Sequence, residues 1–81
     1  MPEANVHYAA ALNSMAVVEY RRGNTEAALA HLEKAAELNA FFFGKNWDYY
    51  RILANRAEIL ASLGRTEEAS ALRAEITAAG Q

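Results

Sequence analysis

Apolar side chains recur with a helical period along most of the chain, and four glycines interrupt that pattern. Glycine tolerates the left-handed backbone that ends a helix, so each segment is predicted to be a helix that stops at its glycine. The predicted helices run from about Glu3 or Val6 to Arg22, from about Glu26 to Phe43, from about Trp47 to Leu63 and from about Glu67 to Ala79. Asn39 is an alternative end of the second helix, because the phenylalanines after it are weaker helix formers. The short connections make successive helices antiparallel neighbours.

Polar residues mark three of the predicted helix starts. Thr25 and Thr66 each open a helix, where a hydroxyl can accept a hydrogen bond from an unpaired backbone amide. A glutamate follows each threonine and complements the positive end of the helix dipole. Asn46 is predicted to cap the third helix, with Asp48 in its first turn.

One apolar stripe on each helix is predicted to form the core. In the first helix the larger apolar residues step by four and three, which keeps them on one face. The predicted core residues are Tyr8, Leu12, Met15 and Val18; then Leu29, Leu32 and Leu38 with Ala28, Ala35 and Ala36; then Tyr49 or Tyr50, Leu53, Ile59, Leu60 and Leu63; and finally Ala69, Leu72 and Ile76.

The chain contains an internal repeat. The stretch Gly23-Asn24-Thr25-Glu26-Ala27-Ala28 returns 41 residues later as Gly64-Arg65-Thr66-Glu67-Glu68-Ala69. The same shift places Leu12 on Leu53, Ala16 on Ala57, Val18 on Ile59 and Ala30 on Ala71. A fixed period of this kind predicts a repeat architecture in which one helix-turn-helix unit is written twice.

On these residues the chain resembles tetratricopeptide repeat proteins. Leu12-Asn13-Ser14-Met15-Ala16 before Gly23 resembles the first helix of such a repeat, and Thr25-Glu26-Ala27-Ala28-Leu29 resembles the second. The resemblance implies an all-α, right-handed α-solenoid fragment: one domain over residues 1–81, with four helices in two antiparallel hairpins. The first repeat covers about 5–43 and the second about 46–80. The period is longer than the usual 34 residues of the family, and Glu19, Arg56 and Arg73 stand where the family has aromatic or apolar residues.

The resemblance also implies a binding face, because the first helix of each repeat lines a concave groove in this family. The predicted partner-binding residues are Asn13, Val17, Tyr20, Arg21, Arg51, Asn55 and Glu58, with Ala10, Ser14, Ala54, Ala61 and Ser62 on the same faces. Asn can hold a peptide backbone through a donor and an acceptor, and Arg can grip a carboxylate with two bonds. A peptide with an acidic residue or a free C-terminus would suit this face. The alternative is an ordinary solvated surface.

Aromatic residues gather where the second predicted helix ends and the third begins. We expect Phe41, Phe42, Phe43, Trp47, Tyr49 and Tyr50 to lie together at one end of the bundle, near Val6, His7 and Tyr8. Consecutive residues on a helix point about 100° apart, so at least one phenylalanine is predicted to be exposed. The cluster either extends the core or forms an interface with another chain. Phe41, Phe42, Phe43, Trp47 and Tyr50 are the candidate interface residues.

Charge and composition argue against several classes of function. The net charge is −2 and the pI about 5.6, so the chain has no basic field for nucleic acid. There is no cysteine, and His7 and His31 are too far apart in sequence for a helical metal pair, so no metal or cofactor is expected. No catalytic motif is visible, and we expect no enzyme activity. With neither a signal peptide nor a membrane-spanning run, a cytoplasmic location is expected.

These observations predict a non-catalytic protein–protein interaction module that binds a peptide or helix on the face of its first and third helices. One alternative is a structural domain that forms a homodimer through the aromatic end or the last helix. Another is a fragment of a longer repeat scaffold or regulator.

Overall fold

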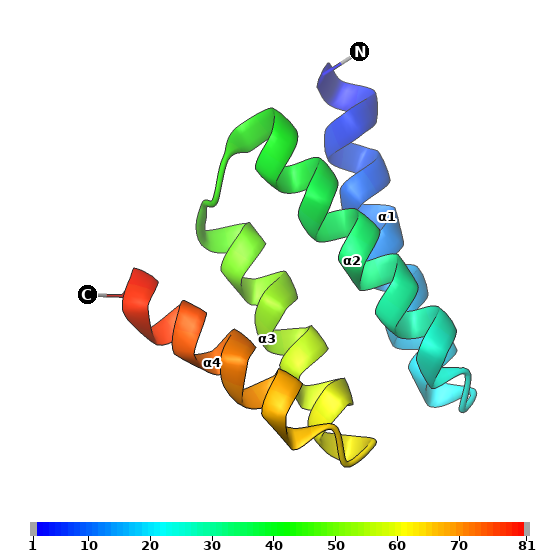
Figure 1. The fold of residues 1–81 in the computed structure, drawn as a ribbon. Helices are drawn as coiled ribbons and strands as arrows, with labels where there is room; N and C mark the ends of the chain where they lie inside the picture. Colours follow the sequence, from blue (N-terminus) through cyan, green and yellow to red (C-terminus); the bar gives the residue numbers. More distant parts are fainter. Residues whose placement is uncertain (1, 81) are drawn as a thin grey trace.

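The chain folds into four helices joined by short turns (Figure 1). The computed structural model describes residues 2–80, and side chains from residue 11 to 80. Helix α1 spans Pro2–Arg21, α2 Thr25–Phe43, α3 Trp47–Ser62 and α4 Thr66–Ala79. Packing joins α1 to α2, α2 to α3 and α3 to α4, so each helix lies beside its neighbours in the chain. The predicted all-α pair of antiparallel hairpins is confirmed; the expected side-chain roles of Val6, His7, Tyr8 and Ala10 lie outside the described side chains.

The two tight turns between paired helices have the same backbone geometry. Gly23 and Gly64 have positive φ angles of 87° and 81°. In the first turn the Asn24 amide donates to the Glu19 carbonyl at 2.8 Å, and in the second the Arg65 amide donates to the Leu60 carbonyl at 2.9 Å. These bonds satisfy carbonyls that a helix end otherwise leaves unpaired. Gly80 differs, with φ at −76°, so α4 does not end in the left-handed conformation.

The threonines do not cap helices as predicted. Asn24 and Arg65 occupy the N-cap positions, without a side-chain capping bond, and Thr25 is the first residue of α2. The Thr25 hydroxyl instead donates to the Gly23 carbonyl at 3.5 Å. Helical geometry therefore resumes one residue earlier than expected, at Thr25 in α2 and at Thr66 in α4.

Asn46 caps α3, as predicted. Its Oδ1 accepts from the Tyr49 amide at 3.0 Å and from Nδ2 of Asn39 at 2.7 Å. Asn39 is buried on α2, and its amide also donates to the Gly44 carbonyl at 3.3 Å. A buried side chain of α2 therefore holds the connection between the two hairpins.

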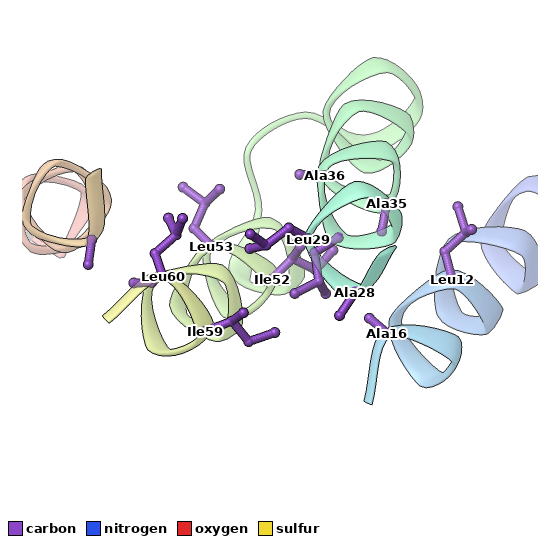
Figure 2. Close-up of a cluster of buried hydrophobic side chains, with 13 residues drawn as sticks. Leu12, Ala16, Ala28, Leu29, Ala35, Ala36, Ile52, Leu53, Ile59 and Leu60 are labelled. Atoms are coloured by element: carbon purple, nitrogen blue, oxygen red, sulfur yellow. The ribbon is translucent and has the colours of Figure 1, made fainter. Parts of the chain in front are cut away.

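The core consists of small and branched apolar residues where the helices touch (Figure 2). Its members are Leu12, Ala16, Ala28, Leu29, Leu32, Ala35, Ala36, Ile52, Leu53, Ala57, Ile59, Leu60 and Ala69. Ala16 of α1 faces Ala28 of α2, so small side chains let these helices approach closely.

Three predicted core residues are exposed, and a fourth packs only at the edge of the core. Met15, Val18 and Leu63 are between 41% and 48% exposed, and Leu38 is only partly buried. Because Met15 and Val18 are exposed, the apolar stripe of α1 is wider than the surface that α1 buries against α2. Ile52, which was not predicted, is buried on α3.

The aromatic residues form two groups instead of one buried cluster. Phe41, Phe42 and Phe43 contact one another at the end of α2, with ring centroids 4.8 Å and 6.4 Å apart for successive pairs. Tyr49 packs edge-on against Tyr50 in α3, and among the described side chains no ring contact joins the two groups. Phe41 is 81% exposed, which confirms that at least one phenylalanine faces solvent.

Candidate interaction site

A groove opens between α1, α2 and α3. Its volume is about 280 Å³. The residues that line it are Ala16, Val17, Tyr20, Arg21, Leu32, Asn55, Glu58 and Ile59. Five of these, namely Val17, Tyr20, Arg21, Asn55 and Glu58, belong to the seven binding residues predicted from the sequence. The structure therefore brings together side chains from α1 and α3 that lie more than 30 residues apart in the chain.

A hydrogen bond between two amide side chains joins α1 to α3. Nδ2 of Asn55 donates to Oδ1 of Asn13 at 3.4 Å. Asn13 comes one residue after the buried Leu12, and Asn55 comes two residues after the buried Leu53. The bond is long, so it leaves the remaining donors and acceptors of both amides able to meet a peptide backbone.

The groove has an apolar floor and a polar rim. Ala16, Leu32 and Ile59 are buried and form the floor. Tyr20 and Val17 are both at least 40% exposed, so an incoming side chain can cover them. A pocket of this kind takes an apolar side chain and orients it through a few polar groups.

The two charges on the rim have opposite signs. Arg21 comes from the last turn of α1, and Glu58 comes from the second half of α3. Since one cation faces one carboxylate, the groove has no strong preference for an acidic ligand over a basic one.

Arg51, the second arginine predicted for this face, lies in a different place. It pairs with Asp48 at 3.6 Å and stacks over the Trp47 ring at 5.4 Å. It lines a separate pocket between α3 and α4. Helices α1 and α3 run in the same direction, so Arg51 near the start of α3 and Arg21 at the end of α1 lie at opposite ends. The two arginines therefore cannot grip one carboxylate.

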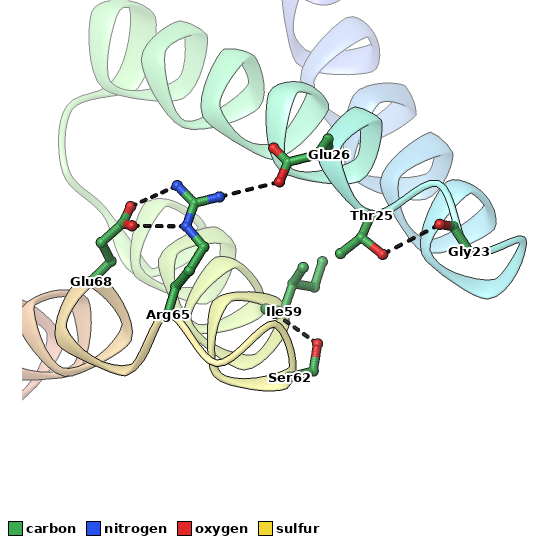
Figure 3. Close-up of polar contacts among 7 residues, drawn as sticks. All are labelled: Gly23, Thr25, Glu26, Ile59, Ser62, Arg65 and Glu68. Atoms are coloured by element: carbon green, nitrogen blue, oxygen red, sulfur yellow. Dashed lines mark hydrogen bonds and ion pairs between the residues drawn. The ribbon is translucent and has the colours of Figure 1, made fainter.

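Sequence reasoning missed a charged network at the glycine-turn end (Figure 3). Arg65 donates to Glu68 through Nε at 2.8 Å and Nη2 at 3.0 Å, and its Nη1 reaches Glu26 of α2 at 3.3 Å. The hydrogen bond from Arg65 lowers the pKa of the Glu68 carboxyl and raises the pKa of the Arg65 guanidinium. Arg65 occupies the position of Asn24 in the repeat, and only its charge against Glu26 and Glu68 could have indicated a link between the hairpins.

The described residues offer no other chemistry in this site. Among them, no three His, Asp or Glu side chains lie close enough together to hold a metal ion. The helices over the same residues lack the combined length and hydropathy needed to span a bilayer.

A comparison with protein families agrees with the repeat seen in the sequence. The family model described as "Tetratricopeptide repeat" matches residues 7–79. Neither the curated proteins nor the solved structures gave a match. The family match includes both hairpins and every residue of the groove.

Proposed function

The chain belongs to the tetratricopeptide repeat family, and from that premise we propose that it is a non-catalytic module that holds a peptide or helix of a partner protein in the groove between α1 and α3. Members of this family are generally protein-interaction modules. One observation carries the proposal: Val17, Tyr20, Arg21, Asn55 and Glu58 line one groove above an apolar floor.

In this proposal, different groove residues make different contacts with the partner. An apolar side chain of the partner covers Val17 and rests on the buried floor, where most of the binding free energy arises. Asn13 and Asn55 hydrogen-bond the partner backbone, because an amide side chain offers both a donor and an acceptor. Arg21 and Glu58 then fix direction, since each accepts one sign of charge.

Selection from a random peptide library displayed on phage, followed by affinity measurements on the selected peptides, tests this proposal. Val17→Arg places a long charged side chain over the floor, and we expect it to weaken binding by about tenfold or more. Ala74→Arg introduces the same side chain at an exposed position of α4 outside the groove and serves as the matched control. Equal affinities for both variants would exclude the groove.

Exposed aromatic rings favour a second candidate function, self-association through the end of α2. Phe41, Phe42 and Phe43 are contiguous and at least 43% exposed. Such apolar patches often mark interfaces. Light scattering across a concentration series measures this directly: we expect a dimer in the unmodified chain and a monomer after Phe41→Ser. A monomer at every concentration would remove this candidate.

A further inference from the structure

A second pocket lies between the first half of α3 and the last turns of α4, away from the groove. Its volume is about 600 Å³. It forms because α4 buries only Ala69, near its start, so α3 and α4 pack tightly beside the Gly64 turn and separate toward their other ends (Figure 1). Trp47, Tyr50 and Ile76 are among its lining residues. The volume falls within the range of pockets that take up a drug-sized group.

The charged side chains that line this pocket are positive, although the chain as a whole is acidic and Glu75 of α4 accepts from the nearby Tyr49 hydroxyl at 3.4 Å. Lys45 and Arg51 line it, and no Asp or Glu among the described side chains does. The net charge of the chain is −2. Asp48 reaches Arg51 at 3.6 Å, but both side chains of this pair are more than half exposed, so the pair is weak. The pocket therefore favours a carboxylate ligand by charge complementarity.

Aromatic rings hold both cations in place. The Lys45 ammonium lies 5.7 Å from the centre of the Tyr49 ring, and the Arg51 guanidinium lies 5.4 Å from the centre of the Trp47 ring. A cation over a ring loses part of its freedom before the ligand arrives, which reduces the entropy cost of binding. Arg51 can then offer its remaining N–H groups to a carboxylate.

The rest of the pocket suits a large apolar side chain. Trp47 is 74% exposed, while Ile76 and Tyr50 are partly buried against the core. An exposed tryptophan beside a cationic pair is the kind of residue that dominates binding free energy at interfaces. The ligand that satisfies both halves of the pocket has a large apolar residue next to a carboxylate.

From this placement we infer that the pocket between α3 and α4 binds an acidic peptide segment of a partner protein, anchored by an apolar side chain on Trp47 and Ile76 and by its carboxylate on Lys45 and Arg51. This surface is separate from the groove of the proposed function. Arg21 lines the groove and Arg51 lines the pocket, and the two sites share no lining residue.

The fluorescence of Trp47 provides the test, because it is the one tryptophan of the chain. The probe is the peptide acetyl-Glu-Leu-Leu-Glu-amide, and its control is acetyl-Lys-Leu-Leu-Lys-amide. We expect saturable emission changes with the acidic peptide, weakening with added salt, and none with the basic one. The double variant Lys45→Gln and Arg51→Gln is expected to lower the affinity for the acidic peptide by about fivefold. Arg73→Gln, at an exposed position of α4 outside the pocket, is the matched control.

Three results would overturn the inference. The first is equal binding of the acidic and basic peptides, and the second is unchanged affinity in the double variant. The third is a concentration-dependent dimer in which Trp47 is already covered without peptide, which would make a second copy of the chain the occupant. Val17→Arg closes the groove but should leave the Trp47 titration unchanged, so failure at one site is distinguishable from failure at the other.

Discussion

The two hairpins carry the same repeat, yet they bury it differently. At positions that face within a hairpin, the matched residues agree: Leu12 and Leu53 are both buried, and so are Ala28 and Ala69. At a position that faces between hairpins they disagree, since Val18 is 48% exposed and its counterpart Ile59 is 6% exposed. Ile59 lies against the first hairpin, in the groove beside Leu32. The repeated sequence therefore determines which residues are buried within a hairpin. Burial at the other positions depends on whether the second hairpin packs there.

The second helices of the two hairpins show the same effect. Helix α2 lies between α1 and α3 and buries Leu32 almost completely. Helix α4 packs against α3, and at the position matching Leu32 it carries Arg73, which is exposed. Within the described residues, the chain thus has a charged residue on α4 where α2 has a buried leucine.

The largest expected effect separates Val18 from Ile59. Ile59→Ala removes buried methyl groups and leaves a cavity, so we expect a loss of about 2–5 kcal/mol in the free energy of unfolding. Val18→Ala removes a half-exposed side chain and also improves helix propensity, so a change under about 0.5 kcal/mol is expected. Urea denaturation followed by circular dichroism measures both. Similar losses for the two variants would mean that the between-hairpin positions are equivalent after all.

The glycine turns are expected to behave alike in both hairpins. Gly23→Ala and Gly64→Ala each place a Cβ at positive φ with no atom within 4 Å to clash, so the cost is conformational, about 1–2 kcal/mol each. Gly80→Ala is the control, because Gly80 has an ordinary helical φ and room for a Cβ, and it should change stability little. The same denaturation experiment applies. A cost confined to one of the two turns would contradict their equivalence.

Arg56 is a second residue that differs from its counterpart in the first hairpin because of where it packs. Its counterpart in the first hairpin is the exposed Met15, but Arg56 packs beside Glu33 and Glu37 of α2 and has a buried Nε without a hydrogen-bond partner among the described atoms. Arg56→Met keeps an unbranched side chain and removes that unpaired group, so we expect a gain of about 1 kcal/mol. The reciprocal Met15→Arg should be nearly neutral. A loss of stability in Arg56→Met would show that the glutamates hold the guanidinium favourably.

The smallest expected effect concerns the charged network that only the second hairpin has. The pKa of Glu68 is below its ordinary value of 4.5, so its stabilising effect is present above that pH and is lost as the pH falls through the folded-state pKa. Glu68→Gln should therefore lower Tm slightly at neutral pH, and this difference should shrink as the pH falls below 4.5. Glu67→Gln removes the same charge from the adjacent exposed position and controls for net charge. If the two variants show the same pH profile of Tm, the Arg65 pairing has no thermodynamic role.

The sequence predicted what local patterns determine. Glycines at the helix ends, the Asn46 cap and the alanine contacts follow from backbone geometry and spacing, and the structure contains all of them. Five of the predicted binding residues line one groove, because helical spacing puts them on one face of their helix. Arg51 was predicted on the same face as Arg21 but lies in a separate pocket. Its position depends on the direction of α3 and on its stacking over the Trp47 ring, which spacing within one helix does not reveal. Burial of Met15 and Val18 was wrongly predicted because hydrophobicity alone does not show which part of an apolar stripe contacts another helix.

Among the described residues, the helices pack mainly against their neighbours in the chain, which has a consequence for how the molecule folds and opens. Contacts at short sequence separation require little loop closure, so we expect folding within microseconds to milliseconds. Opening should then begin at the edge of the array, and α4, which buries Ala69 alone, should exchange its amide hydrogens by local detachment while α2 exchanges only when the whole chain unfolds. The acidic-peptide pocket lies on this loosely held edge, so peptide binding there should slow amide exchange in α4 far more than in α2.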